Sequence, residues 1–162
     1  METLLPHAEK VAALLKRRGE SVAVAESSTG GLIAASLLAM PGASAYFLGG
    51  AVVYTKAARA ALLGSGDAEM TGLRPSTEPY ALMIAKRIRD KHSAVWGLGE
   101  SGATGPTGNR YGDAPGHSCI AIAGKIEKAI TLETGKSDRA ANMRAFAVRA
   151  LELFAETLEA AR

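Results

Sequence analysis

Short apolar segments alternate with amphipathic segments along most of this chain of 162 residues. The apolar segments at residues 21–25, 48–54 and 94–99 have the length and composition of buried strands, and helical patterns separate them. Strands that alternate with helices indicate an α/β fold, here a three-layer α/β/α sandwich around a mixed, mostly parallel central sheet. The length is that of one ordinary domain, so we expect residues 1–162 to form a single domain.

The helical segments have recognisable ends and apolar stripes. A helix over residues 6–18 is expected to end at Gly19, a favoured C-terminal cap. Further helices are expected at residues 30–40, 55–63 and 77–91. The last helix starts near Ser137-Asp138 and carries an apolar stripe at spacings of four, four, three and four: Met143, Ala147, Leu151, Phe154 and Leu158.

The other segments are turns and a late hairpin. Residues 65–76 form a turn-rich linker, and the Gly- and Pro-rich residues 101–116 form a loop. Residues 117–123 and 128–133 are predicted as two strands joined through Gly124. This hairpin implies at least one antiparallel strand in the sheet.

Composition excludes several kinds of partner. The net charge is +3, but the basic residues are scattered, so we expect no nucleic acid partner. Cys119 is the only cysteine and the three histidines show no ligand spacing, so we expect no metal site. Aromatic residues make up only 5% while Ala and Gly are plentiful, which predicts close approach of elements that carry small side chains.

One uncharged stretch, residues 27–55, is long enough to raise the question of a membrane span. Three pairs of turn residues divide it into short pieces: Gly30-Gly31, Pro41-Gly42 and Gly49-Gly50. We therefore expect a loop, a buried helix and a buried strand there, and no membrane partner. The first residues lack the basic and apolar segments of a signal peptide, which indicates a cytoplasmic protein.

Two similar motifs follow predicted strands. Glu26-Ser27-Ser28-Thr29-Gly30-Gly31 follows the first strand and opens a helix, and Glu100-Ser101-Gly102-Ala103-Thr104-Gly105-Pro106 follows the third. Ligands of open α/β sheets bind beyond the carboxyl ends of strands, and a helix start favours an anion. The two motifs therefore predict two walls of one small-molecule pocket, although Ser28 and Thr29 would also serve as plain helix caps. The first motif is no P-loop, because no Gly-Lys-Ser/Thr follows.

These motifs resemble the C-terminal domain family of the competence/damage-inducible protein CinA. The similar segments are residues 25–31, 41–47, 53–55 and 101–106, then Asp138-Arg139 and Arg144. The resemblance implies an α/β/α fold, hydrolysis of the carboxamide of nicotinamide mononucleotide (NMN) with release of ammonia, no metal or other cofactor, and a dimer or higher homo-oligomer.

The resemblance also implies catalytic roles. Ser27 takes the place of the nucleophile, and Tyr54 ends the strand that leads to the general base. The family's Lys is replaced by Arg59, which stays protonated and cannot accept a proton. Lys56 lies three residues earlier on the same helix face and is our candidate base, provided that burial or Arg59 keeps its amine neutral. The alternative is that Lys56 is an ordinary solvated lysine.

A second departure is Glu100, where the family usually has an apolar residue. We consider an ion pair between Arg59 and Glu100, or Glu100 as a base; Glu26 is a weaker candidate base. Expected to bind substrate are Ser28, Thr29, Gly30, Gly31, Ser101, Gly102, Thr104, Gly105, Arg139 and Arg144. Arginine suits a phosphate because its planar fork makes paired hydrogen bonds. Residues 109–113 differ from the family's insert.

Two functions follow as hypotheses. The first is an amidohydrolase acting on NMN or a related amide, with Ser27 as nucleophile and backbone N–H groups near Thr29-Gly30 and Ser101 holding the oxyanion. The second is a catalytically altered nucleotide-binding or regulatory protein that keeps the pocket, because Arg59 replaces the family's Lys. A different small amide or ester is a third possible substrate of Ser27.

Overall fold

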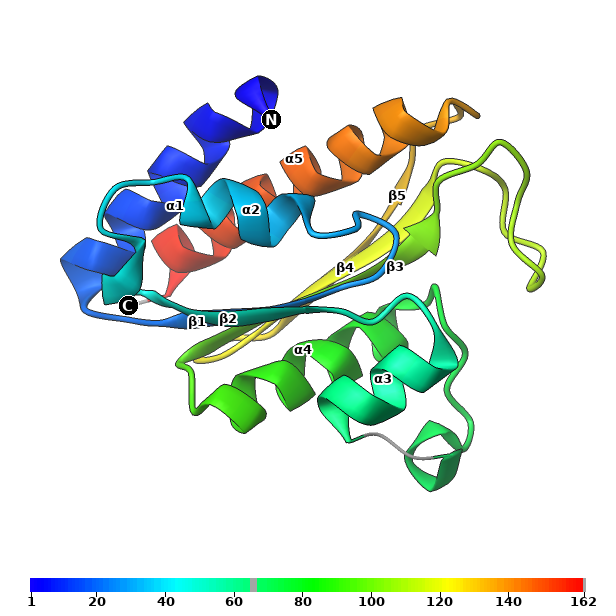
Figure 1. Ribbon diagram of the computed structural model, residues 1–162, viewed down its shortest axis with the longest axis horizontal. Coiled ribbons are helices and arrows are strands. Elements are labelled where there is room, and N and C mark those ends of the chain that lie inside the picture. Colours follow the sequence, from blue (N-terminus) through cyan, green and yellow to red (C-terminus); the bar gives the residue numbers. More distant parts are fainter. Residues whose placement is uncertain (65–66, 162) are drawn as a thin grey trace.

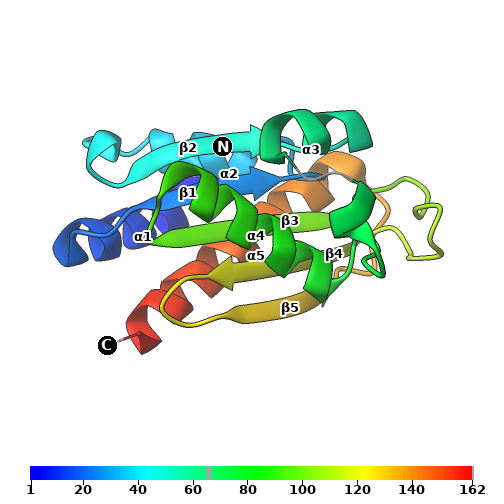
Figure 2. The same cartoon turned by 90° about the horizontal axis from the view of Figure 1, so that it is seen from below.

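The computed structural model describes residues 1–64 and 67–161. Its strands form one sheet in the order β2-β1-β3-β4-β5 (Figure 2). β1 pairs in parallel with β2 and β3, whereas β3 with β4 and β4 with β5 are antiparallel. The mixed sheet is confirmed, but it is not mostly parallel, because parallel and antiparallel pairings occur in equal number. The strands are β1 (Val22–Glu26), β2 (Phe47–Val52), β3 (Trp96–Ala103), β4 (His117–Ala123) and β5 (Lys128–Glu133).

Helices cover both faces of the sheet, which confirms the α/β/α sandwich (Figure 1). On one face lie α1 (Leu5–Arg18), α2 (Leu32–Leu38) and α5 (Arg139–Ala160). On the other lie α3 (Lys56–Leu63) and α4 (Glu78–His92). Short 3-10 helices occur at Glu2–Leu4, Ala43–Ala45 and Asp67–Met70. Within the described ranges, every helix is too short or too polar to cross a membrane.

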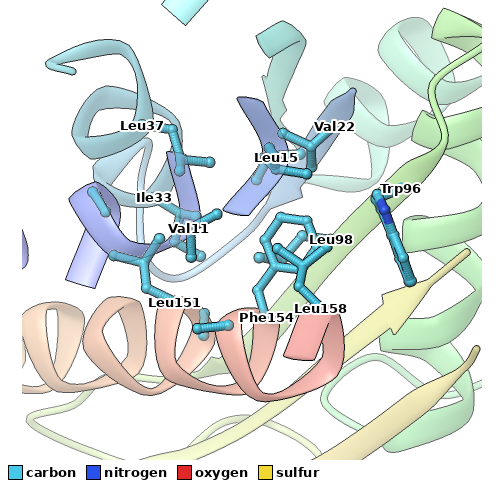
Figure 3. Packing of buried hydrophobic residues seen from close by; sticks show 14 of the residues in the cluster. Val11, Leu15, Val22, Ile33, Leu37, Trp96, Leu98, Leu151, Phe154 and Leu158 are labelled. Carbon is cyan, nitrogen blue, oxygen red and sulfur yellow. The ribbon is translucent and has the colours of Figure 1, made fainter. Parts of the chain in front are cut away.

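The larger hydrophobic core lies between the sheet and helices α1, α2 and α5 (Figure 3). Trp96 meets Phe154 edge to face there, with ring centroids 6.0 Å apart. The Trp96 indole N–H donates to the Glu20 carboxylate over 2.7 Å, so the polar atom of this buried ring is satisfied. The stripe expected on the last helix supplies Leu151, Phe154 and Leu158 to this core.

Helix α4 approaches the opposite face of β3 closely because two glycines leave room for it. A Cβ added at Gly97 would lie 1.9 Å from the carbonyl oxygen of Ala85, and one at Gly99 would lie 2.2 Å from that of Ala81. The expected close approach of elements with small side chains is thus confirmed at this contact.

Most predicted helix ends are confirmed by their caps. The Thr55 hydroxyl accepts from the Ala58 N–H, and the Asp138 carboxylate accepts from that of Ala141. Gly19 and Gly64 end their helices in the left-handed conformation. Residues 65 and 66 of the predicted linker lie outside the described residues.

The predicted loop over residues 101–116 is wrong at its start. β3 continues to Ala103, because β4 pairs with it as far as His117 opposite Ala103. Gly102 fits this strand because its missing Cβ would lie 2.4 Å from the His117 carbonyl oxygen. Tertiary pairing thus overrides a local composition that is typical of a loop.

Candidate active site at the strand ends

The order of the strands creates a crevice at the carboxyl end of β1. From β1 the chain passes through α2 to β2 on one side, and then through α3 and α4 to β3 on the other side of β1. Consecutive connections diverge at such a switch point, which is where α/β sheets bind ligands. Ser27 directly follows β1, residues 53–56 follow β2, and Ser101 lies near the end of β3.

A cavity of about 690 Å³ lies at this point, and both predicted serine turns reach it. Ser27 and Ser101 line it together with Gly102 and, from the turn and helix after β2, Tyr54, Lys56 and Arg59. The proposed convergence of the turns at positions 27 and 101, with basic groups nearby, is therefore present in the structure.

The cavity is aromatic and electropositive. Its aromatic lining residues are Tyr54, Tyr80 and Tyr111, and its cationic ones are Lys56, Arg59, Arg74 and Arg110. Among the lining residues that the structure describes, none is acidic. Flat rings and positive charge favour a planar ligand that carries negative charge.

Strand alternation explains why the two Glu-Ser pairs divide their side chains between opposite faces. Along β3, Leu98 packs in the core on the α1, α2 and α5 side, so Glu100 points the same way and Ser101 points toward α4. Along β1, Val24 likewise places Glu26 on the first side and Ser27 on the other. Both serines therefore face the cavity, and both glutamates lie behind it.

Glu100 is a structural acceptor for the turn that carries Ser27. It is fully buried and accepts from the N–H groups of Ser27 (3.1 Å) and Thr29 (2.9 Å). The hydroxyls of Thr29, Ser28 and Ser118 also donate to it. Five donors saturate this carboxylate, and it does not line the cavity, so it is not placed to act as a base.

The expected ion pair between Arg59 and Glu100 is wrong. Glu100 points to the α2 side of the sheet, whereas Arg59 lies on α3 across the sheet and faces the cavity. The sequence motifs indicated that both residues lie near the site, but they did not indicate the face of the sheet on which each side chain lies.

We predict that Glu100→Gln lowers the free energy of unfolding by about 2 kcal/mol, because hydrogen bonds to a charged group each contribute about that much. The amide cannot accept at both ends, although the hydroxyls of Ser28 and Ser118 can rotate to accept from it. Urea unfolding followed by circular dichroism measures the change. Glu78→Gln is the matched control, because Glu78 accepts from the Thr131 hydroxyl at an exposed site. Equal stability of both variants would contradict the structural role of Glu100.

Glu26 lies beside Glu100 and shares a donor with it. The Thr29 hydroxyl lies 3.0 Å from Glu26 and 2.9 Å from Glu100, yet it has one proton to donate. Burial raises the pKa of Glu26 to about 7. Hydrogen bonds from the Ile33 and Ala34 N–H groups act to lower this pKa, whereas the charge of Glu100 raises it further. A protonated Glu26 can itself donate to Thr29, which satisfies all three groups.

This pKa predicts how stability varies with pH. In the unfolded chain the Glu26 carboxyl ionises near pH 4.5, whereas in the folded protein it keeps its proton until about pH 7. The unfolded state therefore binds fewer protons between these values, and stability falls as pH rises from 4.5 to 7. Over this range the contribution of Glu26 to the free energy of unfolding falls by about 3 kcal/mol.

The comparison of wild type with Glu26→Gln isolates this contribution. As pH rises from 5 to 8, the free energy of unfolding of the wild type should fall relative to that of the variant by about 3 kcal/mol. A difference that stays constant over this range would show that Glu26 is ionised in the folded protein throughout.

The backbone donors of the first motif are used within the turn itself. The Thr29 N–H donates to Glu100 and the Gly30 N–H donates to the Ser27 carbonyl over 3.2 Å. The expected oxyanion donors near Thr29-Gly30 are therefore occupied, and that expectation is wrong. Gly30 and Gly31 adopt positive φ values of 64° and 100°, which turn the chain from β1 into α2.

Several residues expected to bind substrate lie outside the cavity lining: Ser28, Thr29, Gly30, Gly31, Thr104, Gly105, Arg139 and Arg144. Arg139 donates to the Gly105 carbonyl over 2.7 Å and to the Tyr54 hydroxyl over 3.4 Å, so it anchors the loop at the cavity rim. Arg144 is exposed on α5. Ser101 and Gly102 are the expected binding residues that do line the cavity.

Three candidate functional groups that line the cavity differ in exposure. Ser27 is half-buried, and its hydroxyl has no hydrogen-bond partner within residues 1–64 and 67–161. Lys56 is exposed, so burial does not meet the condition set for a neutral amine. Arg59 is only 5% exposed, with its guanidinium carbon 5.9 Å from the centre of the Tyr80 ring.

Two residues that line the cavity and that no sequence motif indicated are Arg74 and Ser76. Arg74 and Asp113 form a paired ion bridge of 2.7 and 3.2 Å, which ties the insert at residues 109–113 to the segment before α4. His117 adds a contact of 2.9 Å between its Nε2 and the Ser76 carbonyl. No local pattern indicates a contact between residues 39 positions apart, so only the fold could find it.

Fold and site together define a class: a three-layer α/β/α domain with a serine-lined pocket at the strand ends. Residues 5–158 match the model of the CinA C-terminal domain. The chain belongs to the CinA C-terminal domain family. In the part of the chain that the structure describes, His, Cys, Asp and Glu form no group able to hold a metal ion.

Curated relatives agree with this assignment. A CinA-like protein of Gloeobacter violaceus is 39% identical over 125 residues, which is 76% of this chain and 29% of that protein. A CinA-like protein of Anaeromyxobacter sp. (strain K) is 37% identical over 145 residues, covering 90% and 36%. The chain thus spans about a third of the length of the curated relatives it matches.

Solved structures show the same fold. A CinA superfamily protein of Klebsiella pneumoniae superposes with a TM-score of 0.90 over 97% of this chain and 98% of that one, at 23% identity. A competence/damage-inducible protein of Agrobacterium tumefaciens gives 0.87 over 96% and 95%, at 26% identity.

Proposed function

We propose that the protein is an amidohydrolase that cleaves the carboxamide of NMN or a related nucleotide to a carboxylate and ammonia, with Ser27 as nucleophile. The observation that supports this most is the convergence of Ser27, Ser101 and Lys56 on one cavity. Its tyrosines suit a pyridine or base ring, and its cations suit a phosphate. Family membership is consistent with this proposal.

The proton of Ser27 needs an acceptor, and Lys56 is our assignment. It provides the only side-chain amine among the described lining residues, and Glu100 and Glu26 lie behind the cavity.

Ammonia release from NMN by the purified protein tests the proposal. Turnover that Ser27→Ala and Lys56→Met both remove would support it, with Ser44→Ala, an exposed serine between α2 and β2, as a control. Turnover that survives Ser27→Ala would remove Ser27 as the nucleophile. A different small amide or ester would serve as substrate if NMN fails but other compounds are cleaved in a Ser27-dependent way.

A nucleotide-binding or regulatory protein without turnover is the second candidate. The observation that favours it is Arg59, a permanently protonated group that lines the same cavity as Ser27. Calorimetric binding of NMN without turnover of any amide would support this reading. Arg59→Lys is informative here, because a gain of NMN hydrolysis would indicate a redirected amidase.

A further inference from the structure

Arg59 presents a buried positive charge to the cavity, and among the described residues no carboxylate pairs with it. The side chain is 5% exposed, and its Nε–H is the one buried side-chain nitrogen or oxygen in the described residues that lacks a hydrogen-bond partner. The guanidinium lies over the face of the Tyr80 ring, which is a weak partner for a buried cation. Buried charges are normally paired, so this group indicates a partner that the cavity receives.

The other cationic residues of the cavity are either paired with a carboxylate or exposed. Arg74 is engaged by both oxygens of Asp113. Arg110 is exposed beside the Tyr111 ring, and Lys56 is exposed as well. Arg59 therefore differs from them in being both buried and without a carboxylate among the described residues.

We infer that Arg59 is the receptor for a carboxylate group of the ligand, so that the cavity prefers an acid to the matching carboxamide. A guanidinium donates through two parallel N–H groups, which match the two oxygens of a carboxylate. A carboxamide offers one oxygen and an NH₂ group that faces these donors unfavourably.

This inference deepens the proposed function and uses the same cavity. If Ser27 hydrolyses the carboxamide of NMN, the new carboxylate forms in a cavity that holds Arg59, and the product is retained. If the protein binds without turnover, its ligand is the acid form of the nucleotide.

Calorimetry with a matched pair of nucleotides tests the preference. NMN and its analogue with a carboxylate in place of the carboxamide are titrated into Ser27→Ala protein, which prevents turnover. We expect the acid to bind at least about tenfold more tightly, the gain typical of one charge-assisted pair. Arg59→Met in the same background should remove the preference, and Arg59→Lys should restore part of it.

Arg149→Met is the matched control, because Arg149 lies on α5 and pairs with Glu156 outside the cavity. It should leave the preference for the acid unchanged. Equal affinities, a preference for the amide, or a preference that survives Arg59→Met would overturn the inference.

A second measurement separates this inference from the proposed function and does not depend on the variants folding. The Arg59 Nε–H is followed by nuclear magnetic resonance in wild-type protein during addition of nicotinate, nicotinamide or ribose 5-phosphate. A shift with nicotinate alone supports the carboxylate site even if NMN is never hydrolysed. A shift with ribose 5-phosphate alone, or none at all, overturns it even if ammonia is released.

Discussion

Under the proposed function, Ser27→Ala should reduce ammonia release from NMN by at least about 10³-fold, because loss of the proposed nucleophile removes the covalent path and leaves only binding and electrostatic stabilisation. Binding of NMN should change little, since the hydroxyl has no described partner to lose and the Ser27 N–H still donates to Glu100. The measurement combines steady-state ammonia release with calorimetry on the same preparations.

Ser101→Ala is the comparison that sharpens this result. Ser101 lines the same cavity, but its oxygen accepts from the Ser76 N–H over 3.1 Å, so it supports the part of the cavity wall formed by Ser76. We expect a loss of about tenfold, the cost of one neutral hydrogen bond. A larger loss for Ser101→Ala than for Ser27→Ala would mean that the nucleophile has been assigned to the wrong serine.

Gly97→Ala should destabilise the fold by about 4 kcal/mol or abolish cooperative unfolding. Overpacking usually costs less when side chains can move, but here the new Cβ would lie 1.9 Å from the Ala85 carbonyl oxygen, in the backbone of α4. The helix would have to move away from β3, which would also move Tyr80 at the cavity. Urea unfolding followed by circular dichroism gives the change in free energy.

Gly49→Ala provides the matched control within the sheet. Its Cβ would also come close to an atom, at 2.4 Å, but that atom belongs to the His92 side chain, which can rotate away. We expect a cost of about 1 kcal/mol. Equal costs at the two positions would show that α4 can move from β3 without penalty and would contradict the close packing described above.

The helices and strands were largely predictable because their signals are local. Gly19 and Gly64 end helices, and Thr55 and Asp138 begin them, through contacts that span only a few residues. The exception is the end of β3, where Gly102 belongs to a strand. Its conformation depends on His117 in the neighbouring strand, which no local pattern reveals.

The position of the site was predictable from the sequence, but the hydrogen bonds within it were not. Strand ends of a parallel arrangement meet at one edge, so the motifs at Ser27 and Ser101 indicated a shared pocket. Glu100 was taken for a base or a partner of Arg59, although it holds the Ser27 turn from the other side of the sheet. The backbone donors assigned to an oxyanion at Thr29-Gly30 serve this turn instead.

Residue order along the chain was sufficient to predict the layers, the caps and the edge where the serines gather, because periodicity and capping operate over a few residues. The partners of Glu26 and Glu100 follow from register and from side-chain alternation between paired strands. Ser27 and Thr29 meet Glu100 across 73 and 71 positions of sequence. Interactions at such separations depend on how whole elements pack, which is why only the folded molecule reveals them.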